Sequence, residues 1–226
     1  MATYHLSVKS GSKGAALSHA KYISRTGAYE KRVADLVHIE SINLPQWAKN
    51  EPDTFWRAAD KFERKNGAVY REFEGALPNE LSTEDQVRLT KEFAAFVAPG
   101  MPLTVAIHRP IAALGEVPQP HFHLMFNERI PDEYERNETA HFKRFNPKNP
   151  ALGGCKKESG GKTRAEISAQ IKDTRKVFCE ITNRYLEEAG SPARVDHRSN
   201  RDRGIDSLPG LHLGYAGVIR EKAGRT

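Results

Sequence analysis

Apolar and polar residues alternate along several short stretches of the chain. From Thr3 to Lys9, for example, Tyr4, Leu6 and Val8 fall on one side and the polar residues on the other. A period of two is typical of a half-buried strand. We predict strands over residues 3–9, 33–42, 68–77, 103–109 and 121–129, the last two forming an antiparallel pair joined by a loop rich in Pro and Gly.

Other stretches show helical spacing or composition. Residues 15–25 are rich in Ala and precede Gly27, and residues 53–65 repeat apolar side chains with the period of a helix. Ser82, three residues before Asp85, resembles a helix-capping box, which predicts a helix to about Val97. A fourth helix is expected over 163–189, whereas residues 131–162 show no periodic pattern.

The predicted strands sort their side chains in the same way. In the third strand Val69 and Phe73 share one face, opposite Glu72 and Glu74. A sheet with one apolar face needs helices over that face and can carry polar chemistry on the other. We therefore expect an α+β fold: an antiparallel sheet of about five strands, with helices packed on one face and the active site on the other. Residues 1–226 are expected to form one domain, with 131–162 as a basic loop and 191–226 as a C-terminal extension.

Charge and cysteine content narrow the range of partners and compartments. The net charge is +6, and the basic excess lies at the two ends of the chain, in residues 1–32 and 131–226. This distribution favours a polyanionic partner that contacts both ends. The two cysteines, Cys155 and Cys179, form no metal-binding motif and suggest free thiols in a reducing compartment. With no apolar stretch long enough to cross a bilayer, we expect a cytoplasmic protein without a membrane segment.

Three histidines are expected on the polar face of the sheet. His121 and His123 are two apart in one strand, and the antiparallel neighbour can bring His108 beside them. Three imidazoles that leave coordination positions open suit a catalytic divalent metal, which can stabilise charge on a reacting phosphate. Since the chain has nine histidines, an H-x-H pair alone is weak evidence, and ordinary strand histidines are the alternative.

A tyrosine in a basic segment is a candidate nucleophile. Tyr22 and Tyr29 lie in the segment HAKYISRTGAYEKR, and Tyr22, on the predicted helix, is the better candidate. Its cations are expected to hold phosphate: Lys21, Arg25, Lys31 and Arg32. Glu72 and Glu74 either take the proton of the tyrosine or orient a histidine, and solvated surface acids are the alternative.

A second group of cations follows the histidine strands. This group is expected to clamp DNA, with a solvated mobile loop as the alternative. Its members are Lys143, Arg144, Lys148, Lys156, Lys157, Lys162 and Arg164.

Over essentially its whole length the chain resembles the MobA/MobL family of plasmid mobilisation relaxases, which are endonucleases of the histidine-hydrophobe-histidine (HUH) class. The matching stretches are YHLSVK, AKYISRTGAY, FERKNGAVYREFEGALPNEL, LTVAIH, PHFHLMFNERI, HFKRFNPKNP, ARVDHRS and LPGLHLG. The resemblance implies a relaxase-like fold, Tyr22 as the nucleophile, Phe122 as the hydrophobe of the motif, and a divalent metal, Mn²⁺ or Mg²⁺, on His108, His121 and His123. It also implies an acid near the tyrosine, placed at Glu74 with Glu72 second.

The resemblance further implies the reaction and its partners. The expected activity is site- and strand-specific nicking of single-stranded or hairpin DNA at an origin of transfer, through a 5′-phosphotyrosyl intermediate that can be religated. Accessory mobilisation proteins and a coupling or secretion system are expected partners. Two alternatives stay open: a rolling-circle replication initiator, in which the tyrosine follows the histidine pair, and a non-catalytic hairpin-binding module with a structural ion.

Overall fold

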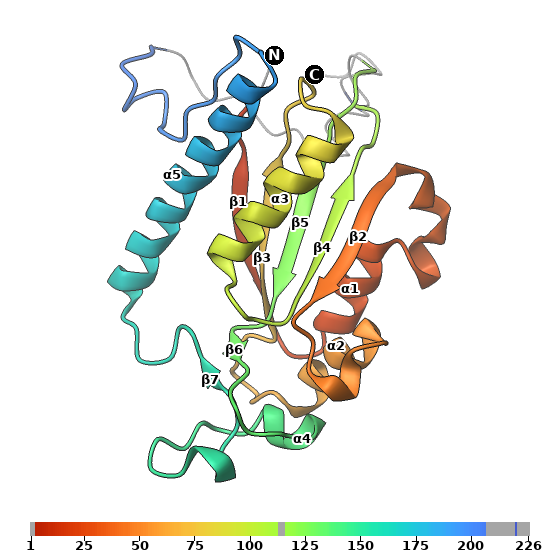
Figure 1. Ribbon diagram of the computed structural model, residues 1–226, viewed down its shortest axis with the longest axis vertical. Coiled ribbons are helices and arrows are strands. Elements are labelled where there is room, and N and C mark those ends of the chain that lie inside the picture. The colour runs from red at the N-terminus through yellow and green to blue at the C-terminus, as the bar shows by residue number, and fades with distance from the viewer. Residues whose placement is uncertain (1–2, 113–115, 207–219, 221–226) are drawn as a thin grey trace.

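A five-stranded antiparallel sheet forms the centre of the protein. The structure is a computed structural model that describes residues 3–112, 116–206 and 220 (Figure 1). The strand order is β1-β3-β5-β4-β2, so β5, which carries the histidine pair, lies in the middle. The α+β class and the antiparallel sheet are therefore confirmed. The strands are β1 (Leu6–Gly11), β2 (Leu36–Ile42), β3 (Tyr70–Ala76), β4 (Leu103–His108) and β5 (His121–Phe126).

The helices fall close to the predicted ranges. The long ones are α1 (Ala16–Ser24), α2 (Pro52–Phe62), α3 (Thr83–Val97) and α5 (Arg164–Glu188). Ser82 accepts a hydrogen bond from the amide of Asp85 at the start of α3, as the sequence predicts, and Thr163 forms a full capping box with Glu166 at the start of α5. None of the described helices is long and apolar enough to cross a membrane.

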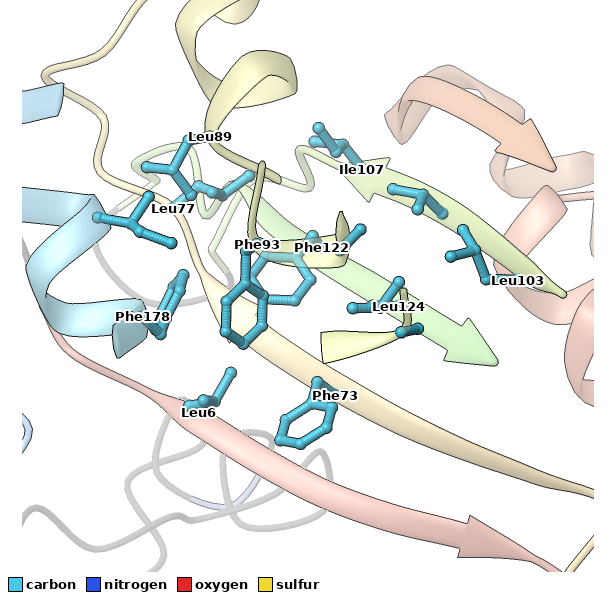
Figure 2. Close-up of a cluster of buried hydrophobic side chains, with 14 of the residues drawn as sticks. Leu6, Phe73, Leu77, Leu89, Phe93, Leu103, Ile107, Phe122, Leu124 and Phe178 are labelled. Carbon is cyan, nitrogen blue, oxygen red and sulfur yellow. The ribbon is translucent and has the colours of Figure 1, made fainter. Parts of the chain in front are cut away.

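The larger hydrophobic core lies between the sheet and helices α3 and α5 (Figure 2). Phe93 of α3 packs against Phe122 of β5 and Phe178 of α5, with ring centroids 5.6 and 4.9 Å apart. Gly75 lies opposite Phe122 in the neighbouring strand, where a Cβ would come within 2.4 Å of the phenyl ring. The absence of a side chain at residue 75 thus lets the central phenylalanine lie flat on β3.

The opposite face of the sheet is also covered, which corrects the expectation that helices pack on one face alone. A second cluster joins α1 and α2 to Ala106 and Met125 of the sheet (Figure 1). Ala16 and Ala20 are buried there, and their small side chains allow α1 to approach the strands. As a result His108, His123 and Glu72 are buried beneath a helix, with 0%, 3% and 1% of their surface exposed.

Val69 corrects a second detail. It packs in the α1/α2 cluster and not beside Phe73, because β3 begins one residue later, at Tyr70, and the alternation does not extend back to Val69. Strand β1 runs two residues beyond its expected end, to Gly11. Both cysteines are free thiols and both are buried.

The region without a periodic pattern, residues 131–162, contains short elements. These are α4 (Glu138–His141), the 3-10 turn η3 (Pro150–Leu152) and strand β7 (Lys156–Lys157), which pairs with β6 (Arg129–Ile130). Two further 3-10 segments, η1 (Gly27–Asp35) and η2 (Gln46–Ala48), follow α1 and β2. Of the expected extension 191–226, residues 207–219 and 221–226 lie outside the described residues, and with them the LPGLHLG stretch.

Candidate active site

Three imidazoles meet over the central strands. His108 and His121 are direct partners in the β4-β5 ladder, and His123 is two residues further along β5. The three ring centroids are 4.8 to 5.4 Å apart, and one nitrogen from each ring lies within 4.8 Å of the others. The predicted convergence of the three histidines is thus confirmed by the strand register.

The nitrogen partners show which rings are ready to bind a cation. Nδ1 of His123 donates to Oε1 of Glu72 at 2.8 Å, and Nδ1 of His121 donates to the carbonyl of Gln119 at 2.9 Å. Nε2 of His123 is buried and has no hydrogen-bond partner in the part of the chain that the structure describes. Since the Nδ1 bonds leave lone pairs on Nε2, His121 and His123 fit a divalent metal, and Glu72 orients the second ring.

His108 differs because both of its nitrogens are engaged. Nε2 donates to the carbonyl of Ile23 at 2.7 Å, and Nδ1 accepts from Nη2 of Arg25 at 3.0 Å. Burial lowers the pKa of His108 to about 4, so the ring is neutral near pH 7. A neutral ring can serve as a metal ligand, but His108 must first give up one of its two hydrogen bonds to free a nitrogen for the metal.

Helix α1 brings Tyr22 to the histidines. The Tyr22 ring centroid is 5.8 Å from that of His123 and 6.4 Å from that of His108. Tyr22 shares a helix face with His19, three residues earlier, whose ring stacks on it at 5.8 Å. The carboxylate of Asp60 in α2 fixes the start of α1, because it accepts hydrogen bonds from the amides of Gly14, Ala16 and Leu17.

Arg25 closes the other end of α1, which corrects its expected role as a phosphate-binding residue. It is only 4% exposed and adopts the left-handed conformation, with φ of 57°. Its guanidinium pairs with Asp35 through two hydrogen bonds, donates to the carbonyl of Tyr22, and lies 4.8 Å from the centre of the Tyr22 ring. A DNA phosphate cannot reach a group so enclosed, so Arg25 holds Tyr22 in place instead.

The two glutamates have different environments. Burial alone would raise the pKa of Glu72, but hydrogen bonds from His123 and His19 outweigh burial and bring it to about 2. Such a carboxylate is a poor base, which favours the orienting role over proton transfer. Glu74 is half-buried and forms an ion pair with Lys9, which helps to keep its pKa below the usual value against the effect of burial.

The other predicted cations divide into free and paired groups. Lys157 is contrary to expectation, since it is half-buried, donates to the carbonyl of Ala68 and pairs with Glu63 at 3.2 Å. Lys162 is exposed but bound to Glu158 and Gln170. The remaining cations have no side-chain partner among the described residues and are available to an anion: Lys21, Lys31, Arg32, Lys143, Arg144, Lys148, Lys156 and Arg164.

Sequence reasoning missed two residues of this site. His19 donates to Glu72 at 2.8 Å, and its position three residues before Tyr22 on a predicted helix was a usable signal. Asp35, the partner of Arg25, is the last residue of the 3-10 segment η1, and nothing in the sequence pointed to this pairing.

Fold and site together define an antiparallel α+β protein in which a helix-borne tyrosine meets a histidine cluster on the sheet. Comparison with known proteins identifies the family: the MobA/MobL family model matches residues 12–222, and the chain belongs to this family. A solved structure described as "Molecular Basis of Vancomycin Resistance Transfer in Staphylococcus aureus" has the same fold, with a TM-score of 0.63 at 24% identity, over 88% of this chain and 100% of that one.

Two curated relatives are similar in sequence. The "43 kDa relaxation protein" of Salmonella typhimurium is 42% identical over 208 residues, and "Mobilization protein A" of Escherichia coli is 42% identical over 229 residues. These alignments cover 91% and 99% of this chain but only 56% and 31% of the relatives. The chain therefore corresponds to part of each relative's length.

Proposed function

We propose that this protein is a relaxase of plasmid mobilisation, which nicks one DNA strand at an origin of transfer. The observation that supports this most directly is the position of Tyr22, whose ring centroid lies 5.8 Å from that of His123, and Nε2 of His123 has no hydrogen-bond partner among the residues that the structure describes. Membership of the MobA/MobL family and relatives named for relaxation and mobilisation agree with it.

In the proposed reaction Oη of Tyr22 attacks a phosphodiester. Oη of Tyr22 loses its proton as it forms a 5′-phosphotyrosyl ester, the bond from phosphorus to the 3′ oxygen breaks, and the leaving 3′ oxygen takes up a proton to give a free hydroxyl. Because one ester replaces another, the reverse reaction rejoins the strand. Arg25 fixes the backbone and ring of Tyr22 during both steps, and Glu72 keeps Nε2 of His123 turned toward the reacting phosphate.

His121 and His123, joined by His108, would hold a divalent cation, which when bound stabilises negative charge on the phosphate. Mn²⁺ and Mg²⁺ are the proposed ions. Imidazole nitrogen is a better ligand for Mn²⁺ than for the harder Mg²⁺.

Replacing Tyr22 with Phe should abolish the covalent product. Labelled single-stranded oligonucleotides tiling the DNA beside the gene are incubated with protein and Mn²⁺ and run on a denaturing protein gel, where the adduct migrates as a labelled protein band. Tyr29→Phe is the matched control, since its ring lies 5.4 Å from that of Tyr22. Adduct formation by Tyr22→Phe but not by Tyr29→Phe would exclude the proposed nucleophile. DNA binding without any adduct on wild-type protein would favour a binding module.

Replacing His123 with Ala should weaken metal binding and nicking together. Titration of Mn²⁺ followed by calorimetry measures binding directly, and EDTA should stop adduct formation by the wild-type protein. His38→Ala serves as a control, because His38 lies on β2, one of the two edge strands of the sheet, and pairs with Glu40. Adduct formation that persists in EDTA would exclude a role for the metal.

The DNA partner, accessory mobilisation proteins and a coupling or secretion system belong to the same proposal. A replication initiator uses similar chemistry. The two functions are distinguished by the oligonucleotides that are cut, since a relaxase cuts those of a transfer origin and an initiator cuts those of a replication origin.

A further inference from the structure

A basic pocket lies beyond the end of β5 that is remote from the histidines. It is a cavity of about 360 Å³ between the turn after α2 and the segment from Arg144 to Gly161. In Figure 1 this region, with α4, β6 and β7, is at the lower end of the sheet, whereas β4 ends with His108 at the upper end. The pocket is therefore separate from the candidate active site.

The lining of this pocket is strongly positive. Five of its nine lining residues are Arg or Lys, and none of the nine is acidic. Arg144 and Lys156 are exposed and have no side-chain partner among the described residues, and Arg64 is 60% exposed, with its Nε 3.7 Å from Glu63. Glu63 itself is fully buried and already paired with Arg129 and Lys157. The uncompensated charge suits an anion that reaches the pocket from solvent.

A buried arginine builds the floor of the pocket. Arg129 is 2% exposed and binds both carboxylate oxygens of Glu63, at 2.9 and 3.0 Å. Its other donors bind the carbonyls of Phe142, Lys143 and Cys155 at 2.7 to 2.9 Å. These bonds fix the backbone directly before Arg144 and directly before Lys156. The segment is thus ordered before any ligand arrives, which lowers the entropic cost of binding.

The same segment is attached to the side of the sheet that carries the histidines. Phe142 packs on Phe55 of α2, with ring centroids 5.7 Å apart, inside the cluster that also contains Ala106 and Met125. Six residues separate His123 from Arg129, which at about 3.3 Å per residue amounts to at most about 20 Å. Each nucleotide of a stacked strand rises about 3.4 Å along the helix axis, so at most about six nucleotides are needed to cover this distance, and an extended single strand needs fewer.

We propose that this pocket binds the phosphodiester backbone of the nicked strand, within about six nucleotides of the cut. Arg64, Arg144 and Lys156 hold the phosphates, and the half-buried Phe145 at the rim stacks on a base. Arg129 takes no part in binding and acts as a positioning residue for the pocket. The distance in nucleotides between the pocket and the cut rests on the proposed nicking function. The affinity of the pocket for single-stranded DNA can be tested independently of nicking.

The test measures binding of fluorescein-labelled dT20 by anisotropy over a range of salt concentrations. Lys156→Gln should reduce the slope of log affinity against log salt by about 0.7, the value for one lost phosphate contact on a single strand. Lys172→Gln removes the same charge from an exposed site on α5 and should leave the slope unchanged. Equal slopes for the two variants would overturn the proposal.

Base stacking has its own pair of variants. Phe145→Ala should weaken dT20 binding roughly 5- to 150-fold. The control is Phe96→Ala, which removes an exposed phenylalanine of α3 and should leave dT20 binding unchanged. With an abasic 20-mer the Phe145→Ala effect should vanish while the Lys156→Gln effect remains. A Phe145→Ala effect of the same size on the abasic strand would show that Phe145 does not stack on a base.

The register is tested on the oligonucleotide that forms the Tyr22 adduct. Adduct formation by Lys156→Gln and by wild type is compared as this oligonucleotide is shortened from one end. The variant should form less adduct on the full-length strand. The difference should disappear once fewer than about six nucleotides remain beyond the cut on that side. A defect that persists at every length would refute the placement. If dT20 binds in the pocket but no oligonucleotide gives an adduct, the pocket stands and the nicking function fails.

Discussion

Two buried arginines, Arg25 and Arg129, organise opposite ends of this protein and do so in different ways. Arg25 pairs with Asp35, whose side chain is 20% exposed, and spends one donor on His108 of the candidate active site. Arg129 pairs with Glu63, whose side chain is fully enclosed, and gives its remaining donors to backbone carbonyls. The comparison indicates that Arg129 contributes mainly to stability, whereas Arg25 contributes mainly to the geometry of the candidate active site.

The largest expected effect is on folding. Arg129→Ala leaves the Glu63 carboxylate in the core with the Lys157 ammonium and the Arg64 amide as its close partners, and loses the bonds to three carbonyls. Breaking a buried pair in this way should lower the free energy of unfolding by about 3–5 kcal/mol. Urea denaturation followed by circular dichroism measures it. The double variant Glu63→Leu, Arg129→Met should recover part of the loss, and a loss below about 1 kcal/mol for Arg129→Ala would contradict the assigned role.

For Arg25 we expect a smaller loss of stability than for Arg129, together with slower adduct formation. Arg25→Ala should cost about 1–3 kcal/mol, because its partner Asp35 can turn to solvent. It should slow adduct formation roughly 10- to 100-fold, since Tyr22 loses both its carbonyl contact and the cation over its ring. Arg25→Lys keeps the charge but not the paired geometry, and should fall between wild type and Ala. Wild-type adduct kinetics in Arg25→Ala, measured at a temperature where it is folded, would show that Arg25 is purely structural.

The smallest effect is expected at Lys162, close to the basic pocket. Its charge is already paired with Glu158 on the surface, so Lys162→Gln should change stability by no more than about 1 kcal/mol. The salt dependence of dT20 binding should match wild type, in contrast to Lys156→Gln. A slope as low as that of Lys156→Gln would mean that the Glu158 pair opens when DNA binds.

Much of the fold could be predicted from the sequence because its strands follow simple rules. The alternation of side chains and the predicted antiparallel pairing placed His108 beside the histidine pair, and in the structure it lies opposite His121. Tyr22 was placed on a helix by local composition alone. Its distance from the histidines could be tested only in the structure, since it depends on how α1 packs.

What sequence reasoning missed depends on contacts between distant segments. The polar face was expected to be open, but the small residues Ala16 and Ala20 let a helix cover it. Arg25 and Lys157 look like any other surface cation in the sequence, and only the fold brings them to Asp35 and Glu63. Residues 131–162 lack a periodic pattern because Arg129 organises them through backbone carbonyls, which every residue possesses.

The anchoring of α1 at both ends has a mechanical consequence. If Tyr22 forms the proposed adduct, the joined strand would transmit tension on the DNA to this one helix, and from there to the carboxylate of Asp60 at its first turn and the guanidinium of Arg25 at its last. Neither anchor is a covalent crosslink, since Asp60 belongs to α2 and Arg25 is the residue that ends α1. In the proposed covalent complex the load would therefore be shared between these hydrogen bonds and the apolar contacts of Ala16, Ala20 and Ile23, and their loss would separate the ester from the histidines.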